Sequence, residues 1–203
     1  MTHAASPAVV ALFPMELTHW AYALSESMLS EPLPRRWAHS LGVAERARSL
    51  ALVLGEDAAL LESAAVLHDI GYAPSIATTG FHPLDGARFL RHKEEADERV
   101  VSLVAHHSCA VLEAEERGLR ADLEAEFAQE RLDLRDALIF CDMTTTPDGR
   151  RTTPAARLEE IISRYRPDTI VGRFIQRAAP EIHAAAARIE RRLAEAADGH
   201  QPM

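Results

Sequence analysis

The segment AAVLHDIGY, residues 64–72, places a histidine and an aspartate side by side at the end of an apolar stretch. The run before them is typical of a buried helix, and Gly71 directly after them is a helix stop signal. An unpaired carboxylate buried at that point would be strongly unfavourable, so Asp69 requires a proton, a cationic partner or a metal. We therefore expect the functional site at His68 and Asp69.

Three further segments that read as helices carry the same kind of group next to an apolar run: His39, the pair His106 and His107, and Asp142. One shared cation would neutralise groups that come from separate helices. Side chains of neighbouring residues on a helix diverge by about 100°, so His68 and Asp69 do not both face one point. An adjacent His-Asp pair can instead bind two neighbouring metals, or one residue can bind a metal while the other orients a ligand of that metal. Imidazole with carboxylate favours Mn, Fe, Ni, Co or Zn over Mg and Ca.

Length and composition predict one all-α domain over residues 1–203. The chain is 47% hydrophobic, which is enough for one sizeable core at this length. Aromatic residues make up only 5% of the sequence, and alanine and leucine dominate. Because these residues favour helix over strand, we expect helices almost everywhere.

Charge and cysteine content restrict the partners and the compartment. The net charge of −9 argues against non-specific binding to a nucleic-acid polymer or an anionic membrane, because both need a basic surface. A small phosphorylated ligand needs only a local positive site, which a bound metal supplies. Cys109 and Cys141 are too few for a disulfide scaffold, so we expect a cytoplasmic protein. The oligomeric state is not fixed by the sequence, and a homodimer is one of the alternatives.

Helix boundaries follow from prolines, glycines and capping residues. Asp57 suits the N-cap of the helix that ends near Asp69, and Thr153 suits the N-cap of a helix that begins at Pro154. The stretch from there to residue 197 reads as helical, divided by Pro167 and Pro180. The acidic run over residues 113–136 reads as a solvated helical face.

The order His39, His68-Asp69, Asp142 resembles the H…HD…D signature of the HD superfamily of metal-dependent phosphohydrolases. The likeness covers residues 37–142, about half of the chain. It implies an orthogonal helical bundle, with the helices of residues 154–197 packing on it. It also implies that these four residues bind a first metal.

Two more pieces are similar to the branches of that superfamily with a two-metal centre. The segment GFHPLDGARFL supplies His82, and VAHHS supplies His106 and His107. The resemblance implies a second metal bridged by Asp69, so that one or two divalent transition-metal ions are expected. Tyr72 is followed by APSIATTG rather than by the lysine and GYP pattern of the cyclic-dinucleotide phosphodiesterases, which argues against that activity.

The resemblance implies hydrolysis of a small phosphorylated metabolite, a nucleotide or related phosphate ester, with Asp69 and His68 as catalytic residues. Asp69 would orient the attacking water and accept its proton. Two alternatives remain open: a mixed-valent di-iron oxygenase that cleaves a carbon bond, and a non-enzymatic helical module with a structural metal. Among arginines near the ligands, Arg35 and Arg36 are candidates for phosphate contacts, although surface arginines are more common.

Overall fold

The computed structural model describes residues 14–198, which contain helices and no β-strand, so the predicted all-α class is confirmed. The helices are α1 (Pro14–Leu29), α2 (Pro34–Arg48), α3 (Ala51–Leu54), α4 (Ala58–Leu67), α5 (His82–His92), α6 (Glu98–His106), α7 (Ala110–Arg117), α8 (Arg120–Glu126), α9 (Leu132–Met143), α10 (Pro154–Arg164) and α11 (Ile170–Asp198). Short 3₁₀ turns form η1 (Gly55–Asp57), η2 (Ile70–Tyr72) and η3 (His107–Cys109).

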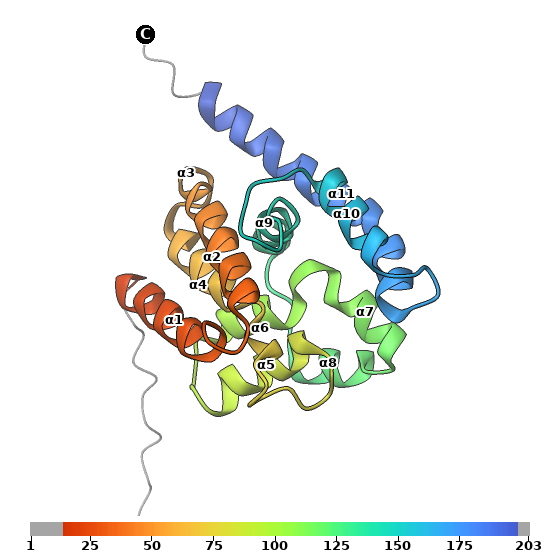
Figure 1. Ribbon diagram of the computed structural model, residues 1–203. Coiled ribbons are helices and arrows are strands. Elements are labelled where there is room, and N and C mark those ends of the chain that lie inside the picture. Colours follow the sequence, from red (N-terminus) through yellow and green to blue (C-terminus); the bar gives the residue numbers. More distant parts are fainter. Residues whose placement is uncertain (1–13, 199–203) are drawn as a thin grey trace, which may run out of the picture.

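Helix α9 occupies the centre of the bundle. Figure 1 shows it nearly end-on, with α1, α2 and α4 on one side of it and α10 and α11 on the other, so that these helices cross it at steep angles. Leu138 and Phe140 belong to the main core that α9 shares with α2, α4 and α6. Ile139 and Met143 face a second cluster with α10 and α11. A helix that is apolar all round has to be buried on every side.

The carboxyl-terminal helices extend this bundle through that second cluster. Leu158 and Ile161 of α10 and Ile175 of α11 pack against the outer face of α9. Thr153 caps α10 as predicted, because its side chain accepts a hydrogen bond from the backbone N–H of Ala156.

The prediction that Pro180 divides the last helices is wrong, because α11 continues through it. Pro180 is exposed, whereas Ala178 and Ile182 on either side of it are fully buried. Packing of the apolar face on both sides of the proline outweighs the one backbone hydrogen bond that proline removes.

Two predictions about acidic side chains also need correction. Asp57 precedes α4 but makes no capping hydrogen bond, because its carboxylate accepts hydrogen bonds from Arg99 and Arg131 instead. The acidic segment is not uniformly a solvated face, since Glu113 and Asp136 at its two ends are buried. Arginine neighbours satisfy both carboxylates, which the charge pattern alone did not indicate.

Gly71 allows the chain to turn closely against the start of α5. A Cβ placed on Gly71 would lie 2.0 Å from the carbonyl oxygen of His82 and 2.7 Å from the backbone nitrogen of Gly86. No side chain fits in that space. The glycine after the His-Asp pair therefore brings Asp69 next to the first residue of α5.

Gly71→Ala should lower the free energy of unfolding by about 1–3 kcal/mol, because backbone atoms must move to admit the methyl group. The same movement should reduce metal binding, since it separates Asp69 from His82. Gly118→Ala is the matched control: Gly118 has a φ of +71° but nothing within 4 Å of the added Cβ. Gly118→Ala should lower the free energy of unfolding without changing the metal content. Thermal melts with metal analysis check both variants, and normal metal content in Gly71→Ala would contradict this role.

Candidate metal centre

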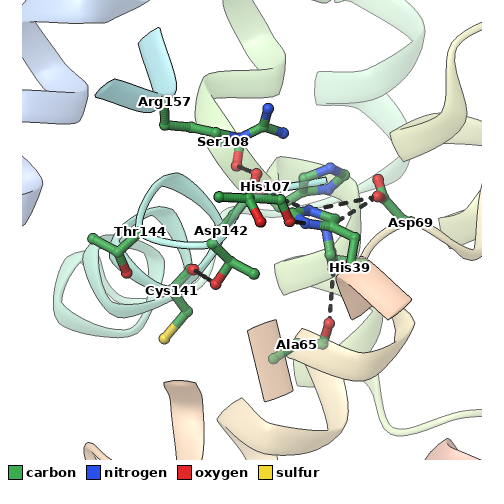
Figure 2. Close-up of polar contacts among 12 residues, drawn as sticks. His39, Ala65, Asp69, His107, Ser108, Cys141, Asp142, Thr144 and Arg157 are labelled. Atoms are coloured by element: carbon green, nitrogen blue, oxygen red, sulfur yellow. Dashed lines mark hydrogen bonds and ion pairs between the residues drawn. The ribbon is translucent and has the colours of Figure 1, made fainter. Parts of the chain in front are cut away.

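Six of the seven predicted ligands converge at one end of the bundle, in two groups of three. In each group the nearest nitrogen or oxygen atoms lie within 4.8 Å of one another. The first group contains His39, His68 and Asp142, and the second contains Asp69, His82 and His107. Figure 2 shows His39, Asp69 and Asp142 directed toward one another from separate elements.

Backbone carbonyls orient three of the histidines. The Nδ1 atoms of His39, His68 and His107 lie 3.0, 2.7 and 2.7 Å from the carbonyl oxygens of Thr146, Ala65 and Val104. Because a carbonyl only accepts, each Nδ1 must carry the proton. A ring that is neutral then presents an Nε2 lone pair to the interior of the site, which is the usual arrangement for a metal-binding histidine. Without a bound metal His68 is protonated, because burial would lower its pKa but the charge of Asp69 raises it to about 9.

The Nε2 atoms are poorly satisfied by the protein alone. His68 Nε2 is buried and has no hydrogen-bond partner among the described residues. His82 Nε2 and His107 Nε2 lie 3.0 Å apart, and because the His107 proton is on Nδ1, His82 Nε2 must donate in this hydrogen bond. Buried imidazole nitrogens that lie beside carboxylates in this way fit a metal cation, which would take the place of the protons.

Asp69 lies between the two groups. Its Oδ2 is 3.3 Å from His68 Nε2 and 3.9 Å from His39 Nε2, whereas its Oδ1 is 3.4 Å from His82 Nε2. Arg36 donates to Oδ2 over 2.7 Å. Burial alone would raise the pKa of Asp69, but the charges of Arg36 and His68 hold it well below its ordinary value. The carboxylate is thus ionised and reaches both groups.

Asp142 is fixed from two sides. His39 Nε2 lies 3.0 Å from Oδ1, and the hydroxyl of Ser108 donates to Oδ2. Burial would raise the pKa of Asp142, but the hydrogen bond with His39 and the charge of His68 hold it below its ordinary value. Ser108 and Cys109 have φ values of +47° and +63°, which is uncommon outside glycine. This strained turn directs Ser108 to Asp142.

His106 is the predicted ligand that the structure does not bring to the site. Its Nε2 donates to the carbonyl oxygen of Phe127 over 2.8 Å, on the other side of α6. The helix ends at His106, and the backbone of His107 is extended. Two adjacent histidines therefore point in different directions, and only His107 faces the other ligands. We leave His106 out of the ligand set.

Arg36, Tyr72 and His82 form a stack at the rim of the site that the sequence did not predict. The Arg36 guanidinium carbon lies 3.9 Å from the centre of the Tyr72 ring, and that ring lies 4.0 Å from the His82 ring at an interplanar angle of 18°. Arg36 was considered only as a candidate phosphate contact. In the sequence, only its position three residues before His39 indicates that Arg36 lies near the site. Its contact with Asp69 could not be read from the sequence, because the two residues are 33 positions apart.

A cavity of about 250 Å³ opens above these ligands. Side chains of Asp69, Asp142 and His107 line its floor. Its walls contain the arginines Arg36, Arg117, Arg157 and Arg164. They also contain apolar side chains, among them Met143 of α9 and Phe174 of α11. Cations in the floor and guanidinium groups in the walls would suit an anionic ligand.

Comparison with known proteins identifies the family. The HD domain family matches residues 36–143, which is more than half of the chain, and the chain belongs to that family of metal-dependent phosphohydrolases. The matched range contains both groups of candidate ligands.

Curated relatives match a shorter segment. Ribonuclease Y of Rubrobacter xylanophilus is 41% identical over 70 residues, which is 34% of this chain and 14% of that protein. Ribonuclease Y of Rhodopirellula baltica is 40% identical over 75 residues, 37% of this chain and 14% of that protein. The chain thus aligns with about one seventh of the length of these relatives. No solved structure matches the chain. Within residues 14–198 no helix has the length and apolarity needed to cross a membrane.

The two adjacent histidines provide a matched test of the second group. We expect protein purified with excess Mn²⁺ to hold two metal ions per chain and His107→Ala to hold one, because a ligand is lost. His106→Gln should keep both ions, since a glutamine amide can still donate to the Phe127 carbonyl. Elemental analysis after desalting measures the ratio. Loss of an ion in His106→Gln but not in His107→Ala would reverse the assignment.

The metal-free protein should lose stability in mild acid. Burial lowers the pKa of His107 to about 4, and burial with the neighbouring His107 holds the pKa of His82 well below its ordinary value. An unfolded histidine titrates near pH 6.5, so between about pH 6.5 and 4 the unfolded chain binds the extra proton and the free energy of unfolding falls.

Urea unfolding of metal-free protein at pH 7.0, 5.5 and 4.5 measures this dependence. His107→Gln is the reference, because it removes the group while other acid-sensitive residues remain. The wild type should lose more stability than the variant over this range. Equal losses would show that His107 does not titrate with a lowered pKa.

Proposed function

We propose that this protein is a phosphohydrolase that uses two divalent transition-metal ions, chosen from Mn, Fe, Ni, Co and Zn, to hydrolyse a small phosphorylated metabolite. A nucleotide or a related phosphate ester is the substrate class that we favour. The observation that carries the proposal is the position of Asp69, which lies between two groups of imidazole and carboxylate donors on the floor of a cavity with arginines in its walls.

His39, His68 and Asp142 would hold one ion, and His82 and His107 the other, with Asp69 shared between them. When bound, such ions supply positive charge that lowers the pKa of water and offsets the charge of the phosphate. The donor set fits them, because every buried Nε2 lone pair then has a partner.

The residues of this chain supply position and charge. Asp69 stays ionised through its contact with Arg36, so it accepts a hydrogen bond from the attacking water and orients it toward phosphorus. His68 is oriented by the carbonyl of Ala65, and its Nε2 lies 3.3 Å from Asp69 Oδ2 of the other group. We therefore propose Asp69 and His68 as the residues on which the rate depends most.

Three features favour a small ester over RNA. A cavity of about 250 Å³ lies just below the range of roughly 300–1,000 Å³ that is usual for small-molecule sites. The net charge of −9 opposes binding of a long polyanion. The helices α10 and α11, which line the cavity, lie outside the matched HD region. The curated relatives are named for RNA cleavage, so RNA is the competing substrate.

We also propose a cytoplasmic location, which the free thiols of Cys109 and Cys141 support.

A substrate panel with each of the five metals tests the proposal. It should contain nucleoside monophosphates, sugar phosphates and a short RNA, and phosphate release should occur with at least one small ester. Asp69→Asn and His68→Ala should each lower the rate by about 10²–10⁴-fold, whereas His106→Gln should not.

Undiminished activity in Asp69→Asn would exclude this mechanism. Cleavage of RNA without hydrolysis of any small ester would assign the site to a ribonuclease. Consumption of oxygen by iron-loaded protein, with no phosphate release, would favour the di-iron oxygenase.

A further inference from the structure

Arg157 on α10 carries a buried polar group that no residue satisfies. Its side chain is only 8% exposed, and its Nε has no hydrogen-bond partner among the described residues. One of its terminal nitrogens donates to Glu160. Leaving a guanidinium N–H buried without an acceptor is unfavourable, so an unpaired group of this kind calls for an explanation.

The guanidinium of Arg157 belongs to the cavity above the ligands. Arg157 lines that cavity together with His107, Ser108 and Asp142. Figure 2 shows it reaching from its helix toward Ser108 and the ligand cluster. Its charge is the smallest of the named influences that hold the pKa of Asp142 below its ordinary value, after those of His39 and His68.

The other arginines that line the cavity also pair with carboxylates, as Arg157 does through a terminal nitrogen. Arg36 donates to Asp69, and two nitrogens of Arg117 donate to Glu113. Arg164 pairs with Glu160 on its own helix. Of the cavity arginines in the described part of the chain, Arg157 is the one with a buried N–H that lacks a partner.

An apolar wall adjoins this guanidinium. Ile161 lies one turn after Arg157 on α10, and Phe174 and Ile175 of α11 line the same cavity. All three side chains are largely buried, so the wall is fixed by packing against α9. A charged donor next to a rigid apolar wall in a small space matches a ligand with an anionic end and a compact organic part.

We infer that Arg157 binds the phosphate group of the substrate, and that the wall formed by Ile161, Phe174 and Ile175 seats the compact organic group of a phosphate monoester. This inference rests on the proposed function and narrows its substrate to terminal monoesters. A guanidinium contacts two oxygens of one phosphate in its plane. A terminal monoester offers more free oxygens for that contact than a phosphodiester linkage within RNA.

The test combines binding with kinetics in Arg157→Met, Arg157→Lys and the control Arg135→Met. Arg135 also has a buried Nε without a partner, but it lines a different cavity, between α9 and α7. Inorganic phosphate is titrated into metal-loaded protein by calorimetry, and the Arg157 Nε–H resonance is followed by NMR. Rates are measured with p-nitrophenyl phosphate and bis(p-nitrophenyl) phosphate, and thermal melts check that each variant is folded.

In Arg157→Met the phosphate affinity should fall by roughly 10- to 100-fold, the range for a lost charged hydrogen bond. The KM for the monoester should rise more than the KM for the diester. Arg157→Lys should restore part of the affinity, and Arg135→Met should match the wild type. The Nε–H resonance should move when phosphate is added.

Unchanged phosphate affinity in a folded Arg157→Met, or an unmoved Nε–H resonance, would overturn the inference while phosphate release by the wild type upholds the proposed function. Phosphate binding through Arg157 without any ester hydrolysis would uphold the inference about Arg157 and defeat the proposed reaction. Tighter binding of a short RNA than of phosphate, independent of Arg157, would count against the monoester.

Discussion

The structure depends on the burial of two carboxylates, Asp69 and Asp142, among imidazole groups at one end of the helical bundle. Charges removed from water are tolerable only when opposite charges and hydrogen bonds compensate for the lost hydration. Arg36 and Ser108 supply part of this compensation. His39 and His68 contribute through their Nε2 atoms, which lie 3.0 Å from Asp142 Oδ1 and 3.3 Å from Asp69 Oδ2. In the function that we propose, metal cations held by these groups would complete the balance of charge.

The fold positions these groups mainly at ends of helices and short turns. His68 and Asp69 follow the last turn of α4, His82 begins α5, and His107 follows α6. At such positions the backbone leaves the helix, so neighbouring side chains can reach different atoms. Free carbonyls near the ends of helices also accept the Nδ1 protons of His68 and His107. Helix termini thus provide most of the candidate ligands and orient two of them.

The sequence predicted the all-α bundle and most of the residues that converge, because a buried ionisable group next to an apolar run is visible without a structure. It could not separate His106 from His107, since their directions depend on the strained turn at Ser108. It did not indicate Arg157, whose contacts exist only after α10 packs on α9. The sequence also predicted a helix boundary at Pro180, but burial of the opposite face of α11 keeps the helix continuous there. Local patterns indicated candidate residues, and tertiary packing determines which of them lie together.

The arrangement of ions around Asp69 is the most direct test of this account. Anomalous diffraction from crystals grown with Mn²⁺ or Zn²⁺ locates metals independently of activity. The account predicts two peaks, one beside His39, His68 and Asp142 and one beside His82 and His107, with the Asp69 carboxylate between them. A metal-loaded crystal without a peak at these residues, or with the metals bound elsewhere, would contradict it.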